Sequence, residues 1–199
     1  MSDSKLKTHI KRFYRNQMEP KGYVLKKARL PERFLEGLRQ GIEFQPGSGH
    51  LAGQFTLNIF WSFTHPLDDG SSMSGAWRIG QILGQGDTWY PCEGDVLDAG
   101  FSAASTALVN SALPFLDAYS TIQKIVEDTN SGKLDSGKAF GLDPGWNSFN
   151  QGYCHRFLGN RQEAIKHFQD VVEKHSDRPY DWVAQRRGAS LAELQGLGA

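Results

Sequence analysis

The alternation of apolar and polar residues between Gly53 and Phe63 is the clearest pattern in the chain. Apolar side chains recur there at every second position, which is the spacing of a strand with one buried face: Phe55, Leu57, Ile59, Trp61 and Phe63. Polar residues take the positions between them, except that Phe60 predicts partial cover of the second face as well. A strand covered on both sides is usually central in its sheet, so helices elsewhere must supply the cover.

Shorter apolar runs on both sides of this segment predict further strands. Residues 23–27, 33–35 and 38–45 precede it, and residues 88–92 are a short strand or extended segment that follows it. The turn Pro46-Gly47-Ser48-Gly49 separates 38–45 from 53–63, so we expect these two strands to be antiparallel neighbours.

Three other segments have the period of helices and are expected to cover the sheet. They are residues 2–18, 95–110, with Gly94 or Asp95 as a cap, and 121–128. Pro114 is tolerated well only in a first helical turn, so the run from Leu113 to Leu116 is expected to interrupt the second helical region.

From Trp146 onward the pattern is helical throughout. Gly152, Gly159, Ala164 and Phe168 stand at the spacings of a tetratricopeptide hairpin, in which small residues let two antiparallel helices approach closely. A single hairpin is not stable as a repeat array. We therefore expect it and a helix near 179–194 to dock on the first domain. We therefore predict an α+β fold, with an antiparallel sheet covered by helices in residues 1–129, a linker at 130–145, and a helical extension at 146–199.

Composition places the chain among ordinary globular proteins but adds an uneven charge distribution. Of 199 residues 39% are hydrophobic, and the net charge is zero. Residues 1–40 hold 11 Lys/Arg and 4 Asp/Glu (11 − 4 = +7), residues 41–145 hold 4 and 12 (4 − 12 = −8), and residues 146–199 hold 7 and 6 (7 − 6 = +1). The acidic middle either serves solubility alone or meets a charged partner.

Two features set the expected compartment. Cys92 and Cys154 form no close-spaced pair and no signal peptide is recognisable, which indicates a reduced, cytoplasmic protein. No apolar stretch approaches the roughly 20 residues that cross a bilayer, so we expect no membrane partner. The basic face of residues 2–18 is typical of a solvated helix, and we expect no nucleic acid partner.

The usual signatures of catalysis and metal binding are missing from the sequence. No Gly-x-Ser-x-Gly elbow, phosphate loop or His-Glu-x-x-His segment is present. Cys154 and His155 are adjacent and would point about 100° apart on a helix, while His167 and His175 are about two turns apart. We predict no catalytic residue, no cofactor and no metal. A small hydrolase or nuclease using His50 or His65 is the alternative.

Several of these segments recur in the same order in a bacterial family. The chain resembles the domain of unknown function 4304 in its amino-terminal helix followed by Gly22-Tyr23, in the Gly53–Phe63 strand, in Arg78-Ile79-Gly80 followed by Asp87-Thr88-Trp89-Tyr90, and in Leu113-Pro114-Phe115-Leu116. The resemblance covers about residues 5–128. The family often has two consecutive tryptophans where this chain has Trp89-Tyr90. Some members are putative immunity proteins, so the resemblance implies binding and silencing of a toxin and carries over no catalytic residue.

We therefore predict an immunity-type protein that binds a cognate protein toxin or effector. Carboxylates in loops or at a helix start are the expected contacts with a basic toxin site, and two tryptophans are candidate anchors. The predicted partner-binding residues are Asp68, Asp69, Trp77, Trp89, Glu93, Asp95 and Asp98. A helical-hairpin scaffold remains open as a further alternative, and it requires an exposed apolar groove on residues 146–194.

Overall fold

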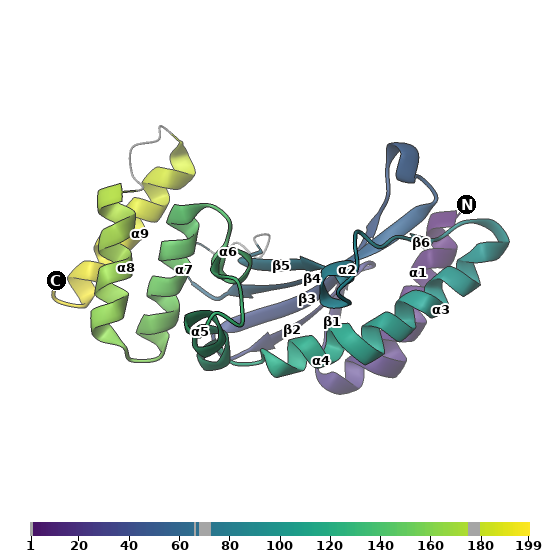
Figure 1. Ribbon diagram of the computed structural model, residues 1–199, viewed down its shortest axis with the longest axis horizontal. Helices are drawn as coiled ribbons and strands as arrows, with labels where there is room; N and C mark the ends of the chain where they lie inside the picture. Colours follow the sequence, from purple (N-terminus) through teal and green to yellow (C-terminus); the bar gives the residue numbers. More distant parts are fainter. Residues whose placement is uncertain (1, 66, 68–72, 175–179) are drawn as a thin grey trace. The chain divides into compact units, whose positions relative to one another are not determined.

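The computed structural model describes residues 2–65, 67, 73–174 and 180–199, which form two compact units (Figure 1). Unit 1 takes the described residues up to 35 together with 39–60 and 76–120. Unit 2 takes 36–38, the described residues of 61–75, and those from 121 onward.

A six-stranded sheet follows the order β1-β2-β3-β4-β5, with β6 also paired to β4. Its strands are β1 (Val24–Lys27), β2 (Leu30–Leu35), β3 (Leu38–Pro46), β4 (Gln54–Phe63), β5 (Gly75–Arg78) and β6 (Tyr90–Pro91). The α+β class and the antiparallel sheet are confirmed, as are the central place of the 53–63 segment and its pairing with 38–45. Phe60 is only 1% exposed, so the second face of β4 is covered there as predicted.

Helices of unit 1 cover one face of its sheet (Figure 1). Phe101 of α3 packs on Phe44 of β3 and Phe55 of β4, with ring centroids 6.3 Å apart in both pairs, and Phe13 of α1 meets its edge at 6.2 Å. The helices of this unit are α1 (Ser2–Phe13), η1 (Tyr14–Met18), η2 (Glu19–Lys21), η3 (Gly49–Leu51), α2 (Ile79–Ile82), η4 (Gly94–Val96), α3 (Leu97–Ala107), η5 (Leu108–Ala112) and α4 (Leu113–Ala118).

The predicted interruption at Leu113–Leu116 is wrong, because η4, α3, η5 and α4 follow one another without a break. The π-helical turn η5 immediately precedes α4, in which Pro114 is the second residue. A wider turn removes the clash between a proline ring and the carbonyl four residues earlier, so the helix continues. Asp95 lies in the first turn, and neither η4 nor α3 has a side-chain cap.

The continuous helix Gly94–Ala118 is, by length and composition, apolar enough to cross a membrane. This run was not anticipated from the sequence. Its apolar side is buried at Leu97, Phe101, Leu108 and Leu116. This burial is typical of a helix that packs on the core of a globular unit.

Unit 2 is built from helices around the end of β4. They are α5 (Ile122–Asn130), α6 (Ser136–Phe140), α7 (Pro144–Phe157), α8 (Arg161–Lys174) and α9 (Asp181–Gly196). The indole Nε1 of Trp61 donates to the carbonyl oxygen of Ala139 at 2.9 Å, and Phe63 stacks on Phe140 at 5.4 Å. Residues 130–145 contain α6, whose Ala139 and Phe140 are buried in these contacts, so this segment is packed into unit 2 and does not act as a linker between domains.

The helical hairpin predicted beyond Trp146 is present as α7 and α8, with α9 packed beside them. Gly152 faces the ring of Phe168, Ala164 is fully buried, and Gly159 has a φ of +75° in the turn, as the small-residue spacing predicted. The unit boundary nevertheless differs from the predicted domains, since unit 2 also takes the segment from Trp61 to Gly75 and all of α5.

Candidate functional site

The predicted carboxylates of unit 1 follow a fixed piece of backbone. Strand β6 pairs antiparallel with the start of β4, with Tyr90 opposite Phe55. The amide of Cys92 then donates to the carbonyl oxygen of Gly53 at 2.8 Å. Glu93 follows with an extended backbone, so the chain leaves the sheet at a defined point before the helix begins.

The segment from Glu93 to Asp98, here called the acidic segment, is exposed at most of its positions. The Asp98 side chain is 85% exposed, Val96 is 54% exposed, and Asp95 is exposed as well. An apolar side chain therefore lies between carboxylates at the surface. Asp68 and Asp69, predicted to belong to the same surface, lie outside the described residues.

Helix α1 limits the acidic segment on one side. Nε2 of His9 lies 3.0 Å from Oδ1 of Asp98. Both residues line a hollow of about 270 Å³ between α1 and α3, together with Arg12 and Phe13. The guanidinium-bearing Arg12 of α1 thus lines the same hollow as Asp98, while Asp95 is exposed.

The two tryptophans differ in their surroundings. Trp77 is 7% exposed and its ring meets Phe115 edge-on at 5.2 Å, so it is a core residue and its predicted role as an anchor is wrong. Trp89 is half-buried, and its Nε1 donates to Oδ2 of Asp87 at 2.9 Å. The guanidinium of Arg78 lies over its ring at 5.2 Å, and Trp89, which directly precedes β6, keeps part of its surface exposed.

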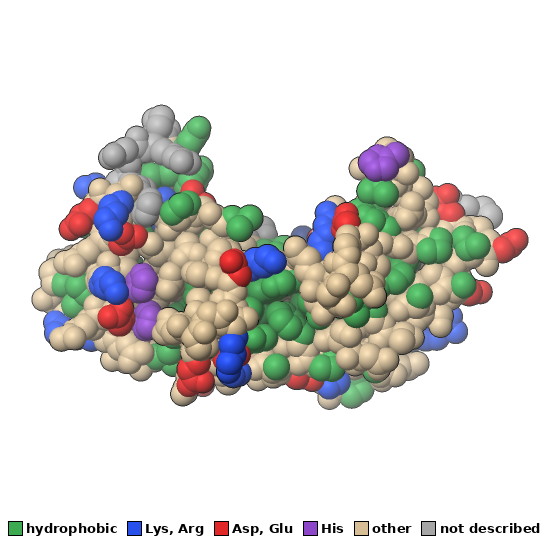
Figure 2. Space-filling view, viewed as in Figure 1, with side chains coloured by type: hydrophobic (Ala, Val, Ile, Leu, Met, Phe, Trp, Pro, Cys, Tyr) green, Lys and Arg blue, Asp and Glu red, His purple; other side chains and the backbone are tan. Residues whose placement is uncertain are grey.

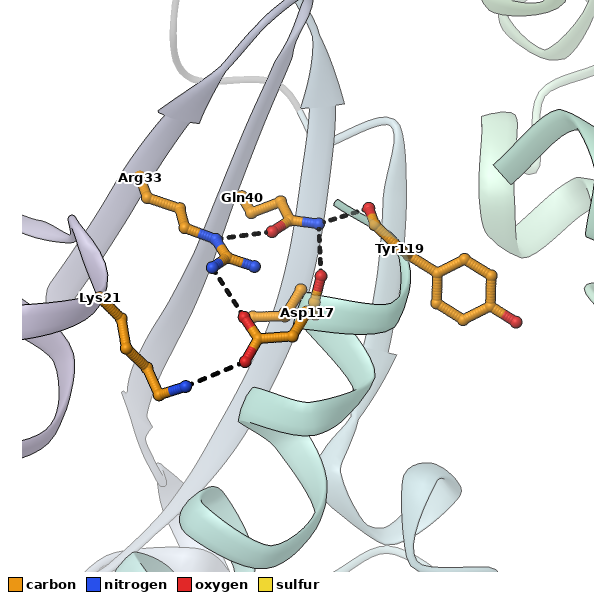
Figure 3. Close-up of polar contacts among 6 residues, drawn as sticks. Lys21, Arg33, Gln40, Asp117 and Tyr119 are labelled. Atoms are coloured by element: carbon orange, nitrogen blue, oxygen red, sulfur yellow. Dashed lines mark hydrogen bonds and ion pairs between the residues drawn. The ribbon is translucent and has the colours of Figure 1, made fainter. Parts of the chain in front are cut away.

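A polar network inside unit 1 was not predicted from the sequence (Figure 3). Nε of Arg33 donates to Oε1 of Gln40 at 2.9 Å, and Nη1 of Arg33 donates to Oδ1 of Asp117 at 2.7 Å. The amide of Gln40 donates to the carbonyl oxygens of Leu116 and Tyr119. The network joins β2 and β3 to the end of α4 through hydrogen bonds between the protein's own groups, which indicates a structural role.

Lys21 completes the network from η2, with Nζ 3.0 Å from Oδ2 of Asp117. Burial acts to raise the pKa of Asp117, but hydrogen bonds and charge from Lys21 and Arg33 outweigh it and hold this pKa below its usual value. The carboxylate is therefore ionised and paired at neutral pH.

The two histidines of the hydrolase alternative have different surroundings. His50 is exposed on η3 in unit 1. His65 belongs to unit 2 and is enclosed by the rings of Phe149 and Tyr153, each 5.1 Å away. Its Nδ1 accepts a hydrogen bond from the amide of Leu67 at 3.2 Å. His65 is thus a core histidine, and the two residues lie in different units.

Unit 2 has an apolar pocket of about 240 Å³ at the end of α7. Tyr153, Cys154 and Phe157 of α7 form one wall, and Phe157 remains 47% exposed. The other lining residues are Gly37, Phe63, Thr64, Ile122 and Arg156. Burial raises the pKa of the Cys154 thiol well above its usual value, so this group is not a reactive nucleophile.

The sequence reasoning missed one cluster of metal-ligating side chains in unit 2: His155, Glu163 and His167. Glu163 and His167 are four residues apart on α8, a spacing visible in the sequence. His155 joins them only because the α7–α8 turn folds α7 back against α8. A hairpin prediction would have placed residues equally distant from Gly159 opposite each other.

No known protein family, curated protein or solved structure matches the chain. The resemblance to the domain of unknown function 4304 therefore stays a prediction.

Proposed function

We propose that this chain is a non-enzymatic, cytoplasmic immunity-type protein that binds a cognate bacterial toxin and covers its active or substrate-binding surface. The supporting observation is the acidic segment, in which exposed Asp95 and Asp98 flank exposed Val96. Although His9 contacts one oxygen of Asp98, that side chain is 85% exposed, so it and its exposed neighbours can meet another molecule's surface.

The chemistry of this surface favours a basic protein partner. Toxins that act on nucleic acids or nucleotides carry positively charged sites, and carboxylates attract such sites by charge complementarity. Val96 would be buried at the centre of the contact, with the carboxylates around it, which is the usual order of apolar core and polar rim. A stable interface needs about 800 Å² on each partner, so contacts must extend over neighbouring residues such as Trp89.

The cysteines fit the proposed compartment. Cys92 and Cys154 are both free and buried. A chain with two unpaired thiols is suited to a compartment that keeps thiols reduced.

Co-expression with the product of the adjacent gene tests the proposal. We expect that product to stop growth when expressed alone and to be neutralised, and captured from solution, by this protein. Replacing Asp95→Lys and Asp98→Lys together should weaken both neutralisation and capture by at least about tenfold, since each close charge pair contributes about 1 kcal/mol or more.

The matched control replaces Glu36→Lys and Glu173→Lys, two exposed carboxylates of unit 2. This double variant carries the same charge change and should neutralise as the wild type does. The proposal is abandoned if the neighbouring product is harmless, or if a toxic product is not neutralised by the wild-type chain. Equal losses in both double variants would assign the effect to net charge and remove the role of the acidic segment.

A scaffold that binds another protein through unit 2 is the second candidate, and the apolar pocket beside Phe157 favours it. Such a pocket has the size to take one apolar side chain of a partner. Phe157→Asp would then abolish capture while the Asp95/Asp98 variant would not, which separates the two candidates in one assay.

A further inference from the structure

The α7–α8 turn of unit 2 brings two histidines together. The amide of Asn160 donates to the carbonyl oxygen of His155 at 2.8 Å, which closes the turn. The rings of His155 and His167 are parallel within 7°, with centroids 5.4 Å apart. Figure 2 shows two histidine side chains side by side on the surface of this hairpin. Glu163 lies one helical turn before His167 and therefore on the same side of α8.

One ligand atom from each of these residues lies within 4.8 Å of the others. Two imidazoles and a carboxylate form a donor set that suits zinc and the neighbouring divalent transition metals, and that suits magnesium or calcium poorly. We propose that His155, Glu163 and His167 bind one divalent transition metal ion, Zn²⁺ being the reference case. Three protein ligands leave a fourth position to water.

The ligand atoms must move closer for this ion to bind. Bonds of about 2.0–2.1 Å in a tetrahedral site place ligand atoms about 3.3 Å apart, so no pair of ligand atoms needs to approach by more than about 1.5 Å. Glu163 is exposed and His167 half-buried, so their side chains can rotate toward the centre. His155 is only 6% exposed and supplies the fixed ligand.

The existing partner of Glu163 does not prevent this change. Oε2 of Glu163 lies 3.1 Å from Nζ of Lys166, and both side chains are largely exposed, at 49% and 70%. An exposed ion pair of this kind contributes little to stability. A carboxylate bound to the ion would release Lys166 to solvent at small cost.

Asn160 is placed to orient the first histidine. Its side-chain Nδ2 lies 3.4 Å from Nδ1 of His155. An amide can present either its nitrogen or its oxygen to an imidazole, and with the oxygen turned inward it would accept from Nδ1–H and leave Nε2 for the ion. Hydrogen bonds of this kind fix the tautomer and ring orientation of metal-bound histidines. Asn160 is therefore a positioning residue of the proposed site.

The test uses full-length, tag-free protein stripped with a chelator and titrated with ZnCl₂ at pH 7.5. We expect one ion per chain by calorimetry and a rise of the unfolding temperature, because the ion joins α7 to α8 in the folded state only. The absorption spectrum of the Co²⁺ form should show four-coordinate geometry without a thiolate band. A thiolate band would overturn the donor set, since it would place Cys154 or Cys92 on the ion.

Three variants and two controls identify the ligands. Asn160→Leu should lower the Zn²⁺ affinity by roughly 10- to 100-fold, the usual cost of losing an orienting group. His167→Gln and Glu163→Gln should each lower it further, because they remove a ligand. His50→Gln and Glu173→Gln change an exposed histidine and an exposed carboxylate elsewhere and should bind as the wild type does. The proposal fails if wild-type protein binds Zn²⁺ no more tightly than His167→Gln, or if the controls lose as much affinity. It rests on other residues than the proposed toxin contact, so either can fail alone.

Discussion

A Cβ atom at Gly152 would lie 2.7 Å from Cε1 of Phe168, closer than real Cβ atoms approach a neighbour. Phe168 is fully buried, so its ring cannot move aside without opening the core of unit 2. Gly152→Ala should therefore lower the free energy of unfolding by about 1–3 kcal/mol, the usual cost of overpacking. Gly188 on α9 has open space around its Cβ position, and Gly188→Ala should raise stability by about 0.5–1 kcal/mol. Urea titrations measure the free energy of unfolding of both variants. If both substitutions raise it, helix propensity outweighs the close approach of Gly152 to Phe168.

The ion pair between Glu32 and Arg39 is a second feature decided by single residues. Nη1 of Arg39 lies 2.7 Å from Oε1 of Glu32, and the side chains are 5% and 4% exposed. Glu32→Gln would remove the carboxylate charge that lies 2.7 Å from the buried guanidinium and should cost about 3–5 kcal/mol in urea unfolding. The double change Glu32→Leu with Arg39→Met removes both charges and should cost far less, because desolvation nearly cancels the attraction within a buried pair. A double variant as unstable as the single one would show that the pair itself stabilises unit 1.

Among the elements, α4 is attached to the sheet by Asp117 through Arg33 and Lys21. The pKa of Asp117 is lower in the folded protein than its usual value of 3.8, so the folded state binds fewer protons. The stability from this group is present above the unfolded pKa of about 3.8 and is lost as the pH falls through the lower folded pKa. Asp117→Asn should thus cost about 1 kcal/mol at pH 7, a value reduced for the partial exposure of the carboxylate.

The difference between wild type and Asp117→Asn should shrink when the pH falls below about 3.8, as measured by guanidinium unfolding at several pH values. Asp95→Asn removes an exposed carboxylate outside the network and should stay within about 0.5 kcal/mol of wild type at pH 7. If the difference in unfolding free energy between wild type and Asp117→Asn stays constant with pH, the ion-pair explanation is wrong and the difference comes from packing.

The same elements show where sequence patterns suffice. The period of two in residues 53–63 predicts β4, because a strand with a buried face needs an apolar side chain at every second position. Small residues at 152 and 164 predict the hairpin, because two closely packed helices need small side chains where they meet. Pro114 misled the prediction, since a π-helical turn before it has no residue signature of its own. The segment 130–145 misled it as well: its composition is that of a loop, but Phe140 and Ala139 are buried by distant residues Phe63 and Trp61.

For the whole molecule, sites depend on which segments the fold brings together. The acidic segment is predictable because its carboxylates are close in sequence and fall at a helix start. The cluster of His155, Glu163 and His167 could have followed from the predicted hairpin, but it was missed because the search compared residues by their separation in sequence and not across the α7–α8 turn. Trp77 was misassigned for a related reason: an aromatic side chain serves equally as anchor or core, and only its burial against Phe115 decides.

The whole chain has no net charge, so any electrostatic attraction of a toxin must come from the uneven distribution of its charges. If the acidic segment meets a basic partner, salt should slow association: stopped-flow rates should fall steeply between low and physiological ionic strength, where the Debye length shrinks to about 8 Å. Asp95→Lys with Asp98→Lys should lower the low-salt rate by about tenfold or more and flatten the salt dependence. The dissociation rate should change less, since exposed rim charges act mainly on encounter.

The double variant Glu36→Lys with Glu173→Lys should keep the wild-type dependence of the association rate on salt. A wild-type rate that does not depend on salt would rule out charge attraction and leave an apolar contact, with Val96 or Phe157 as the residue to test next.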